Sequence, residues 1–225
     1  MVSASLMSLT EVTFGKLLPS QPLFSNYAEA FQRANFGQFM WNSARLTAIT
    51  LTGQLLVCIP AAYAFARVEF PGRDTLFLAV LSTLMLPGTV TLIPTFLIAH
   101  QLGLTNTFWG VVLPGFASAF GIFLLRQGFL NIPRELEDAA RIDGSGFFGT
   151  YWRIMLPLAK AAMITLGVFI FLDEWSSFIW PLIVLSDWRK YPVTVGIALF
   201  RDVNSINWPS VFAGSTLISF PIVIL

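Results

Sequence analysis

The sequence predicts an all-α polytopic membrane protein, and three features of its composition support that prediction. Hydrophobic residues make up 56% of the chain and charged residues only 11%, less than half of the about 25% charge that is usual in soluble domains. The formal net charge of +1 offers no basic surface to nucleic acid. One cysteine and one histidine are too few for a disulfide framework or a Cys/His metal site. We therefore expect no metal site and no nucleic-acid partner.

Uncharged stretches long enough to cross a bilayer define the expected spans. A stretch of 21 residues lies between Arg45 and Arg67 and matches the about 20 residues that one helical crossing needs. The 51 uncharged residues from 75 to 125 are too many for one crossing, so we expect two spans separated by a turn at His100–Thr107. Ala161–Ser186 forms a fourth predicted span, and Ser210–Leu225 is the start of another.

Prolines and glycines within these stretches are predicted to interrupt the spans. Irregular backbone of this kind is tolerated in transporters where it lines a cavity. The residues concerned are Gly53, Pro60, Pro87, Gly88, Pro94, Pro114 and Gly121.

Basic residues are denser on one side of the predicted spans. Segments 67–74 and 126–160 hold seven of the 13 Lys and Arg residues, at about twice the density of the opposite side, and such an excess is typical of cytoplasmic loops. We therefore expect segment 126–160 to be cytoplasmic.

Within that segment, residues 131–163 read NIPRELEDAARIDGSGFFGTYWRIMLPLAKAAM and predict a short helix with clear ends. Pro133 suits a first-turn position, and three acids follow it where negative charge is favourable in a helix dipole. Gly144 is typical of a helix end with a left-handed backbone. Leu136, Ala139 and Ala140 are spaced to form one small apolar face, which suits a partner's groove.

The spacing of this stretch resembles the EAA loop of ABC importer permeases, in the carbohydrate branch related to the maltose permease. The family pattern is EAA, three residues, G, nine residues and I-x-L-P. Asp138 stands where the family has Glu, which keeps the charge but shortens the side chain. The strings ELEDAARIDG, FPGR at 70–73 and WPL at 180–182 also resemble the sugar-importing branch. The residues that match the pattern are Asp138, Ala139, Ala140, Gly144, Ile154, Leu156 and Pro157.

The resemblance implies that this loop forms a coupling helix seated in a groove of a separate cytoplasmic ATPase. The chain itself has no GxxxxGK[ST] phosphate loop, so we expect no catalytic residue here, no cofactor of its own, and ATP and Mg bound by the partner ATPase. The residues expected to couple to the ATPase are Glu137, Asp138, Ala139, Ala140, Asp143, Gly144, Ile154, Leu156 and Pro157.

The resemblance also implies the assembly and its location. The expected partners are a sister permease subunit, a dimeric ABC ATPase, an extracytoplasmic solute-binding protein and the lipid bilayer of a bacterial or archaeal inner (cell) membrane. Family members have six spans, so we expect this chain to lack the first span and the end of the last. The predicted organisation is an N-terminal outer segment over 1–45 and a permease transmembrane domain over 46–225, with the coupling loop at about 131–157.

Two acids lie in the predicted fourth span, where an ionisable side chain costs at least about 2.5 kcal/mol unless it faces a cavity or a partner. We interpret them as lining a translocation pathway, with a purely structural pair as the alternative. The segment EWSSFIWPL resembles the family's WN(D/E)F-WPL, and its rings suit stacking on sugars or packing on neighbouring helices. The expected pathway residues are Asp173, Glu174, Trp175, Ser176, Ser177, Phe178 and Trp180.

The predicted function is that of a permease subunit of an ATP-driven ABC importer, for a sugar or oligosaccharide, that works by alternating access. Two alternatives stay open. One is the same machinery with a peptide, an amino acid or an anion as substrate. The other is an ion-coupled secondary transporter in which Asp173 or Glu174 carries a proton or a sodium ion. A requirement for ATP and a soluble binding protein would distinguish the two ABC importer hypotheses from the ion-coupled transporter hypothesis.

Overall fold

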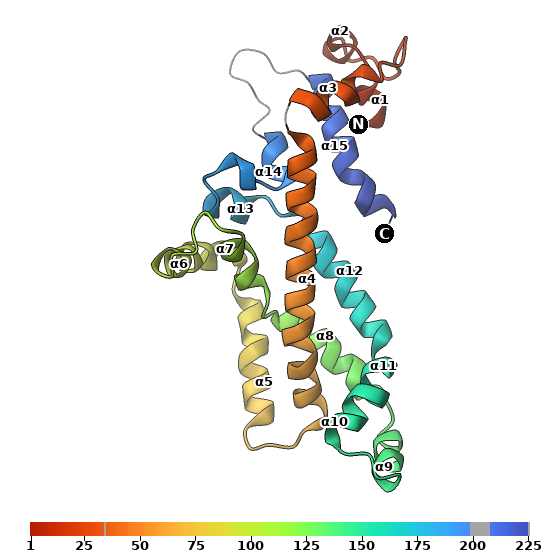
Figure 1. The fold of residues 1–225 in the computed structure, drawn as a ribbon, viewed down its shortest axis with the longest axis vertical. Coiled ribbons are helices and arrows are strands. Elements are labelled where there is room, and N and C mark those ends of the chain that lie inside the picture. The colour runs from red at the N-terminus through yellow and green to blue at the C-terminus, as the bar shows by residue number, and fades with distance from the viewer. Residues whose placement is uncertain (34, 199–207, 225) are drawn as a thin grey trace. The chain divides into compact units, whose positions relative to one another are not determined.

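The computed structural model describes residues 1–33, 35–198 and 208–224, and within these ranges every regular element is helical. Figure 1 shows the elements in chain order. The chain divides into two compact units, which are described separately here. Unit 1 comprises residues 1–47, 102–111 and 172–225, and unit 2 comprises residues 48–101 and 112–171. Helices α4 (Phe36–Arg67) and α12 (Lys160–Ser176) each continue from one unit into the other.

Helix α4 alone, among the described residues, is long and apolar enough to cross a membrane as one helix. Three pairs of helices reach that length only together, across breaks of 103°, 44° and 67°, which gives up to four candidate spans. Helix α15 (Trp208–Ile224) is a shorter apolar helix. The turn expected at residues 100–107 is confirmed, because α6 (Gly88–Gln101) ends and α7 (Phe108–Val112) begins on either side of it.

Unit 2 contains the C-terminal part of α4 and a set of shorter helices around one apolar core. Cys58, Leu125, Phe129, Met155 and Leu166 are among the most deeply buried side chains of that core. The elements are α5 (Arg73–Ser82), η1 (Thr83–Met85), α6, η2 (Leu113–Gly115), α8 (Ala119–Leu130), α9 (Glu135–Ile142), α10 (Phe147–Thr150), the π-helical segment η3 (Tyr151–Met155), α11 (Leu156–Leu158) and most of α12.

Local sequence explains where two of these elements begin. Pro71 and Gly72 lie at the centre of a turn between α4 and α5, in which the amide of Arg73 donates to the carbonyl of Phe70 at 3.3 Å. Gly72 has φ +81°, which a type II turn requires at its third residue and which glycine adopts without strain. Leu86 is extended because it precedes Pro87, and this separates η1 from α6.

Several predicted interruptions are instead positions inside continuous helices, so that prediction is wrong for Gly53, Pro60, Pro94 and Gly121. The two glycines allow close packing. A Cβ on Gly53 would lie 2.4 Å from the ring of Phe116. Small residues permit such approaches between helices in membranes. Pro87 and Gly88 do lie at the break between η1 and α6, and Pro114 lies in η2, just before the break at residues 116–118.

Unit 1 contains the remaining helices and a second core formed by Phe36, Phe39 and Val193. Its C-terminal helix α15 lies against α1 and α3. The elements not yet given bounds are α1 (Val2–Ser5), α2 (Leu9–Thr13), α3 (Ser25–Arg33), α13 (Ile179–Val184), the 3-10 turn η4 (Trp188–Lys190) and α14 (Val193–Ala198). Helix α4 passes through residue 45 without a break, so the domain boundary expected there stays a prediction.

Polar side chains of α4 and of the 102–107 turn hold the chain around η4 within unit 1. Asn106 adopts φ +56°, and its side-chain oxygen accepts hydrogen bonds from the amides of Ser186 and Asp187 at 3.3 and 3.0 Å. The Asn42 amide donates to the carbonyls of Arg189 and Tyr191 at 2.8 and 3.0 Å. These bonds satisfy main-chain groups that lie between α13 and α14.

Candidate functional site

Helix α9 is the short helix that the sequence predicted, with the start and end it predicted to within two residues. Its first turn carries three acids, which complement the positive end of the helix dipole. At its other end the amide of Gly144 donates to Arg141 and that of Ser145 to Ala140, at 3.0 and 2.8 Å. This is the paired hydrogen bonding of a Schellman motif, which needs a left-handed residue. Gly144 supplies it with φ +81°.

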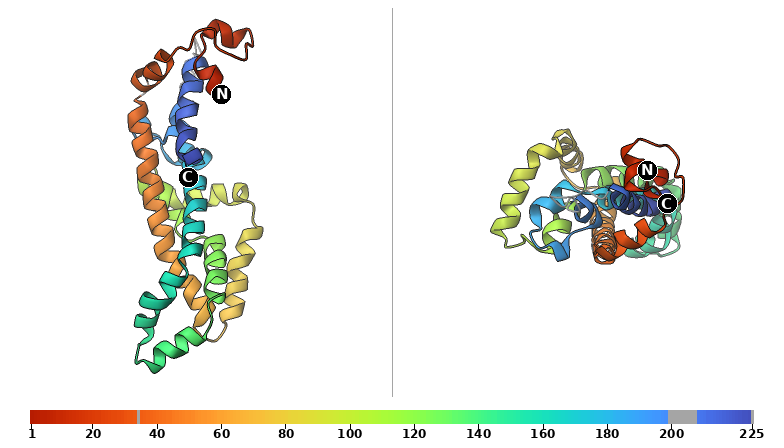
Figure 2. Two further views of the ribbon diagram at one scale, coloured as in Figure 1. Left: turned by 90° about the vertical axis from the view of Figure 1, so that its right-hand side faces the viewer. Right: turned by 90° about the horizontal axis from the view of Figure 1, so that it is seen from above.

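The two sides of α9 differ in what they contact. Glu137 and Ala140 are buried within unit 2. Leu136, Ala139 and Ile142 are exposed, and Ile142 is 86% accessible. The predicted apolar face is therefore shared between an inner side and an outer side, with Ala140 facing inward. Figures 1 and 2 show α9 and α10 at the end of unit 2 where α4 terminates.

Arg67, the last residue of α4, lies at the inner side of α9 and contacts both α9 and the end of α8. Its Nε atom lies 3.2 Å from Oε1 of Glu137, and both side chains are almost fully buried. The contact is an ion pair by distance, although neither atom meets the geometry of a hydrogen bond. One terminal nitrogen of Arg67 donates to the carbonyls of Phe129 and Ile132, at and just beyond the end of α8. A cation is favourable beside such free carbonyls.

A second arginine strengthens the contact between α4 and α8. Nε of Arg126, on α8, donates to the carbonyl of Phe65 at 3.2 Å. Its guanidinium lies 4.2 Å from the centre of the Phe77 ring on α5, a cation–π arrangement. Each of α4 and α8 thus presents an arginine to main-chain carbonyls of the other.

Tyr63 of α4 contacts the second half of the 131–157 loop. Its ring centre lies 5.7 Å from that of Phe147 and 4.8 Å from that of Tyr151. The predicted motif residues Ile154 and Leu156 are half-buried and Pro157 is exposed, within the continuous turns of η3 and α11. Both halves of the loop are therefore attached to the end of α4, one by an ion pair and one by rings.

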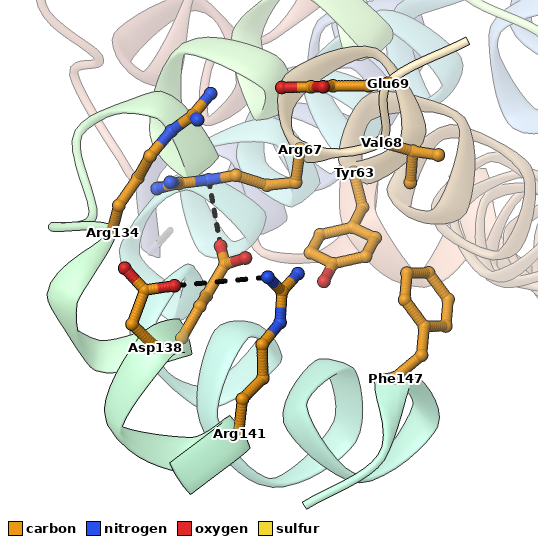
Figure 3. A pocket seen from close by; sticks show the side chains of 9 residues that line it. Tyr63, Arg67, Val68, Glu69, Arg134, Asp138, Arg141 and Phe147 are labelled. Carbon is orange, nitrogen blue, oxygen red and sulfur yellow. Dashed lines mark ion pairs between the residues drawn. The ribbon is translucent and has the colours of Figure 1, made fainter.

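A pocket of about 350 Å³ lies between the end of α4 and α9. Figure 3 shows Arg67, Arg134 and Arg141 around it together with Glu69, Asp138 and Tyr63. The Asp138–Arg141 pair on its rim spans 4.0 Å, and both side chains are about two-thirds exposed, so it contributes little to stability. Three arginines face three acids, and the pocket therefore carries no excess charge that would select an anion.

The second predicted site, around residues 173–180, lies at the break between α12 and α13. Helix α12 ends at Ser176, so a span continuous to residue 186 is wrong, and the placement of the acids at its middle is wrong too. Asp173 and Glu174 lie in the last turn of α12, where negative charge opposes the helix dipole. Asp173 is exposed.

The two indoles of this segment make specific contacts within unit 1. Nε1 of Trp175 donates to the carbonyl of Ile218 at 3.0 Å, and the side chain is buried. Nε1 of Trp180 donates to the carbonyl of Val111 at 3.1 Å. Both indoles therefore have contacts within the chain, which supports the packing alternative. Asp173, Ser176 and Phe178 are the exposed members of the predicted pathway set, and Glu174 and Ser177 are half-buried.

Sequence reasoning missed Arg67 and Tyr63. An arginine that ends a 21-residue uncharged stretch has an ordinary explanation as an interfacial residue. The FARVEFPGR string around it was the available signal, because it places a basic residue just before a turn in the densest basic region.

The described residues combine several candidate spans with a short helix attached to the end of one of them, an architecture that suits a membrane transport subunit. The chain belongs to the family of binding-protein-dependent transport system inner membrane components, whose model matches residues 54–225.

The chain aligns over most of its length with longer relatives that are named as permease proteins of transport or uptake systems. The chain is 34% identical to the arabinooligosaccharides transport system permease protein AraQ of Halalkalibacterium halodurans, covering 92% of this chain and 75% of AraQ. It is 34% identical to the sn-glycerol-3-phosphate transport system permease protein UgpE of Brucella abortus, covering 93% and 77%. It is 32% identical to the diacetylchitobiose uptake system permease protein NgcG of Streptomyces coelicolor, covering 92% and 70%.

A solved structure shares the fold. A chain from a bacterial ABC transporter involved in the import of the acidic polysaccharide alginate matches with a TM-score of 0.89 and 27% identity, covering 99% of this chain and 85% of that one. The fold is therefore that of an ABC importer permease.

Proposed function

We propose that this ABC importer permease carries a sugar or oligosaccharide by alternating access, driven by a separate ATPase that docks on α9. The names of AraQ and NgcG, and the alginate importer, support a carbohydrate substrate. The proposed partners are a dimeric ATPase, which binds ATP and Mg, a sister permease and an extracytoplasmic binding protein. The proposed location is a bacterial or archaeal inner membrane, with the 131–157 loop on the cytoplasmic side.

The observation that carries the coupling proposal is the two-sided character of α9. Its inner side is fixed by a buried ion pair, while Leu136, Ala139 and Ile142 remain exposed on the other side. A helix with small and apolar residues on a free face suits a groove on a partner. Because its inner side is anchored, movement of a docked ATPase would reach the end of α4.

The exposed residues at the α12–α13 break are the proposed pathway contacts. Asp173 and Ser176 offer a carboxylate and a hydroxyl, and Phe178 offers an apolar ring that is 37% exposed. Hydroxyl-rich solutes are recognised by a few polar groups placed among apolar and aromatic surface. Trp175 and Trp180 would then fix the position of the break through their hydrogen bonds to Ile218 and Val111.

A phosphorylated polyol is the second candidate substrate, because UgpE is named for sn-glycerol-3-phosphate. The carbohydrate is the first candidate, because AraQ, NgcG and the alginate importer are all named for carbohydrates. Membership of a binding-protein-dependent family likewise favours ATP-driven transport over the ion-coupled alternative.

The test is reconstitution. The full-length protein is expressed with its operon neighbours, and the purified complex is placed in liposomes with ATP inside and the binding protein outside. We expect uptake of an oligosaccharide that requires ATP, the binding protein and both permease subunits. Uptake driven by an ion gradient without ATP would overturn the proposal, and preferential uptake of glycerol 3-phosphate would replace the sugar with the second candidate.

A further inference from the structure

We infer that Arg67 and Glu137 form an internal strut that positions α9, so that Glu137 acts on transport through Arg67 rather than by touching the ATPase. This inference rests on the proposed docking of an ATPase on α9. It assigns a positioning role to a pair that joins the last residue of α4 to the first turn of the docking helix.

The Glu137 side chain is buried on the inner side of α9, opposite the exposed side on which a partner would dock. Its carboxylate faces Arg67 at 3.2 Å and its side chain is 10% exposed. The neighbouring acids Glu135 and Asp138 on the same turn are exposed. Of the three, Glu137 is therefore the one whose charge is directed into the permease.

The Arg67 side chain is fixed by contacts with the end of α8 as well as with α9. Its side chain is 4% exposed, and it donates to the carbonyls of Phe129 and Ile132 next to the end of α8. A single guanidinium thus joins the ends of α4 and α8 to α9. A planar group with several donors in fixed directions can make all three contacts, whereas an ammonium cannot reproduce them together.

The rest of the interface would not by itself fix the tilt of α9. The rings of Phe147 and Tyr151 pack on Tyr63, but they belong to α10 and η3, beyond the turn at Gly144. Between that turn and Ile132, Ala140 is the other buried side chain on the inner side. Without the ion pair, a movement of α9 with the ATPase would not be transmitted to α4 and α8.

The matched variants are Glu137→Gln and Glu135→Gln. Both remove one negative charge from the first turn of α9, so both lose the same favourable interaction with the helix dipole. Only Glu137→Gln removes the charge that faces Arg67. The readout is the number of substrate molecules transported per ATP hydrolysed, measured on complexes purified with the ATPase bound. Because the ratio is measured on assembled complexes, lower expression or assembly does not change it. A merely structural role of Glu137 would lower expression or assembly and leave the ratio unchanged.

We expect Glu137→Gln to keep the ATPase bound and to lower the transport ratio by about fivefold or more, the lower end of the usual range for coupling between two sites. Glu135→Gln should leave the ratio unchanged. An unchanged ratio in Glu137→Gln would overturn the strut, while the bound ATPase would leave the proposed function standing. Loss of the ATPase from Glu137→Gln would overturn it too, since Glu137 would then belong to the docking surface.

A double-mutant cycle tests the pairing itself. If the two side chains act as one unit, Arg67→Gln combined with Glu137→Gln should lower the transport ratio no further than the more harmful single variant. Losses that multiply would show that the two residues act separately, and the assignment of the pair would be wrong.

Discussion

The loop around α9 and the break between α12 and α13 use their characteristic side chains in opposite ways. In the loop, contacts within the chain take up one side of α9 and leave Leu136 and Ala139 free. At the break, both indole groups are engaged with carbonyls of unit 1. Residue type alone therefore does not distinguish a ring that stacks on a solute from one that packs within the protein: an indole N–H usually finds a partner when it is buried, and here the chain supplies that partner.

The largest effect is expected at Trp175, and it tests whether the indoles at the break serve packing within the chain. Trp175→Ala removes a buried ring and its hydrogen bond to Ile218, and we expect a loss of about 3–5 kcal/mol in stability. Thermal unfolding of the purified complex should show a clear shift, with loss of assembled protein. Trp41→Ala is the control, because Trp41 is 68% exposed on α4. Equal shifts in both variants would contradict the packing role.

The next effect concerns the acid at the same break. Asp173→Ala should leave assembly near normal, because the side chain is exposed. It should lower uptake by about tenfold, which corresponds to about 1.4 kcal/mol. Uptake and complex yield are measured together, with Asp74→Ala on α5 as an exposed-acid control. Parallel losses of uptake and yield would favour a structural role for Asp173.

A smaller effect is expected at the end of α9. Gly144→Ala forces a side chain into a left-handed backbone at a cost of about 1 kcal/mol, because its Cβ would meet no atom within 4 Å and only the backbone is strained. Gly146→Ala is a close control, since Gly146 is equally open and has φ −73°. Gly144→Ala should lower substrate-stimulated ATP hydrolysis, whereas Gly146→Ala should not. The same rate in both would show that the turn does not set the tilt of α9.

The smallest effect concerns the N-terminal segment. Hydrogen bonds from the Ser20 hydroxyl and from the amides of Ser8 and Ser20 lower the pKa of Glu11 to about 2. A lowered pKa stabilises the folded segment above the ordinary value of 4.5, and that stabilisation is lost as the pH falls from there toward 2. The protection of the Ser8 and Ser20 amides from hydrogen exchange, relative to the intrinsic exchange rate at each pH, should fall in that window. In Glu11→Gln this protection should be low throughout, and a pH response that persists would contradict the assignment.

Sequence patterns predicted the features that depend on neighbours along the chain. The turn at 100–107 and the left-handed end of α9 at Gly144 are both confirmed, because glycine and polar residues act locally there. Features that depend on tertiary neighbours were not predictable in this way. Pro60 lies within a continuous helix, and the inward direction of Glu137 is set by Arg67, 70 positions earlier in the chain.

The most direct test of the central claim is ATPase retention by Ala139→Trp. Ala139 is exposed on the free side of α9, and Ala28 is a matched exposed alanine on α3. Both variants should reach the membrane normally, because neither changes a buried side chain. We predict that Ala139→Trp loses the copurifying ATPase by overpacking the docking face, while Ala28→Trp keeps it. Full retention and normal transport in Ala139→Trp would contradict the account, since α9 would then not be the surface on which the ATPase docks.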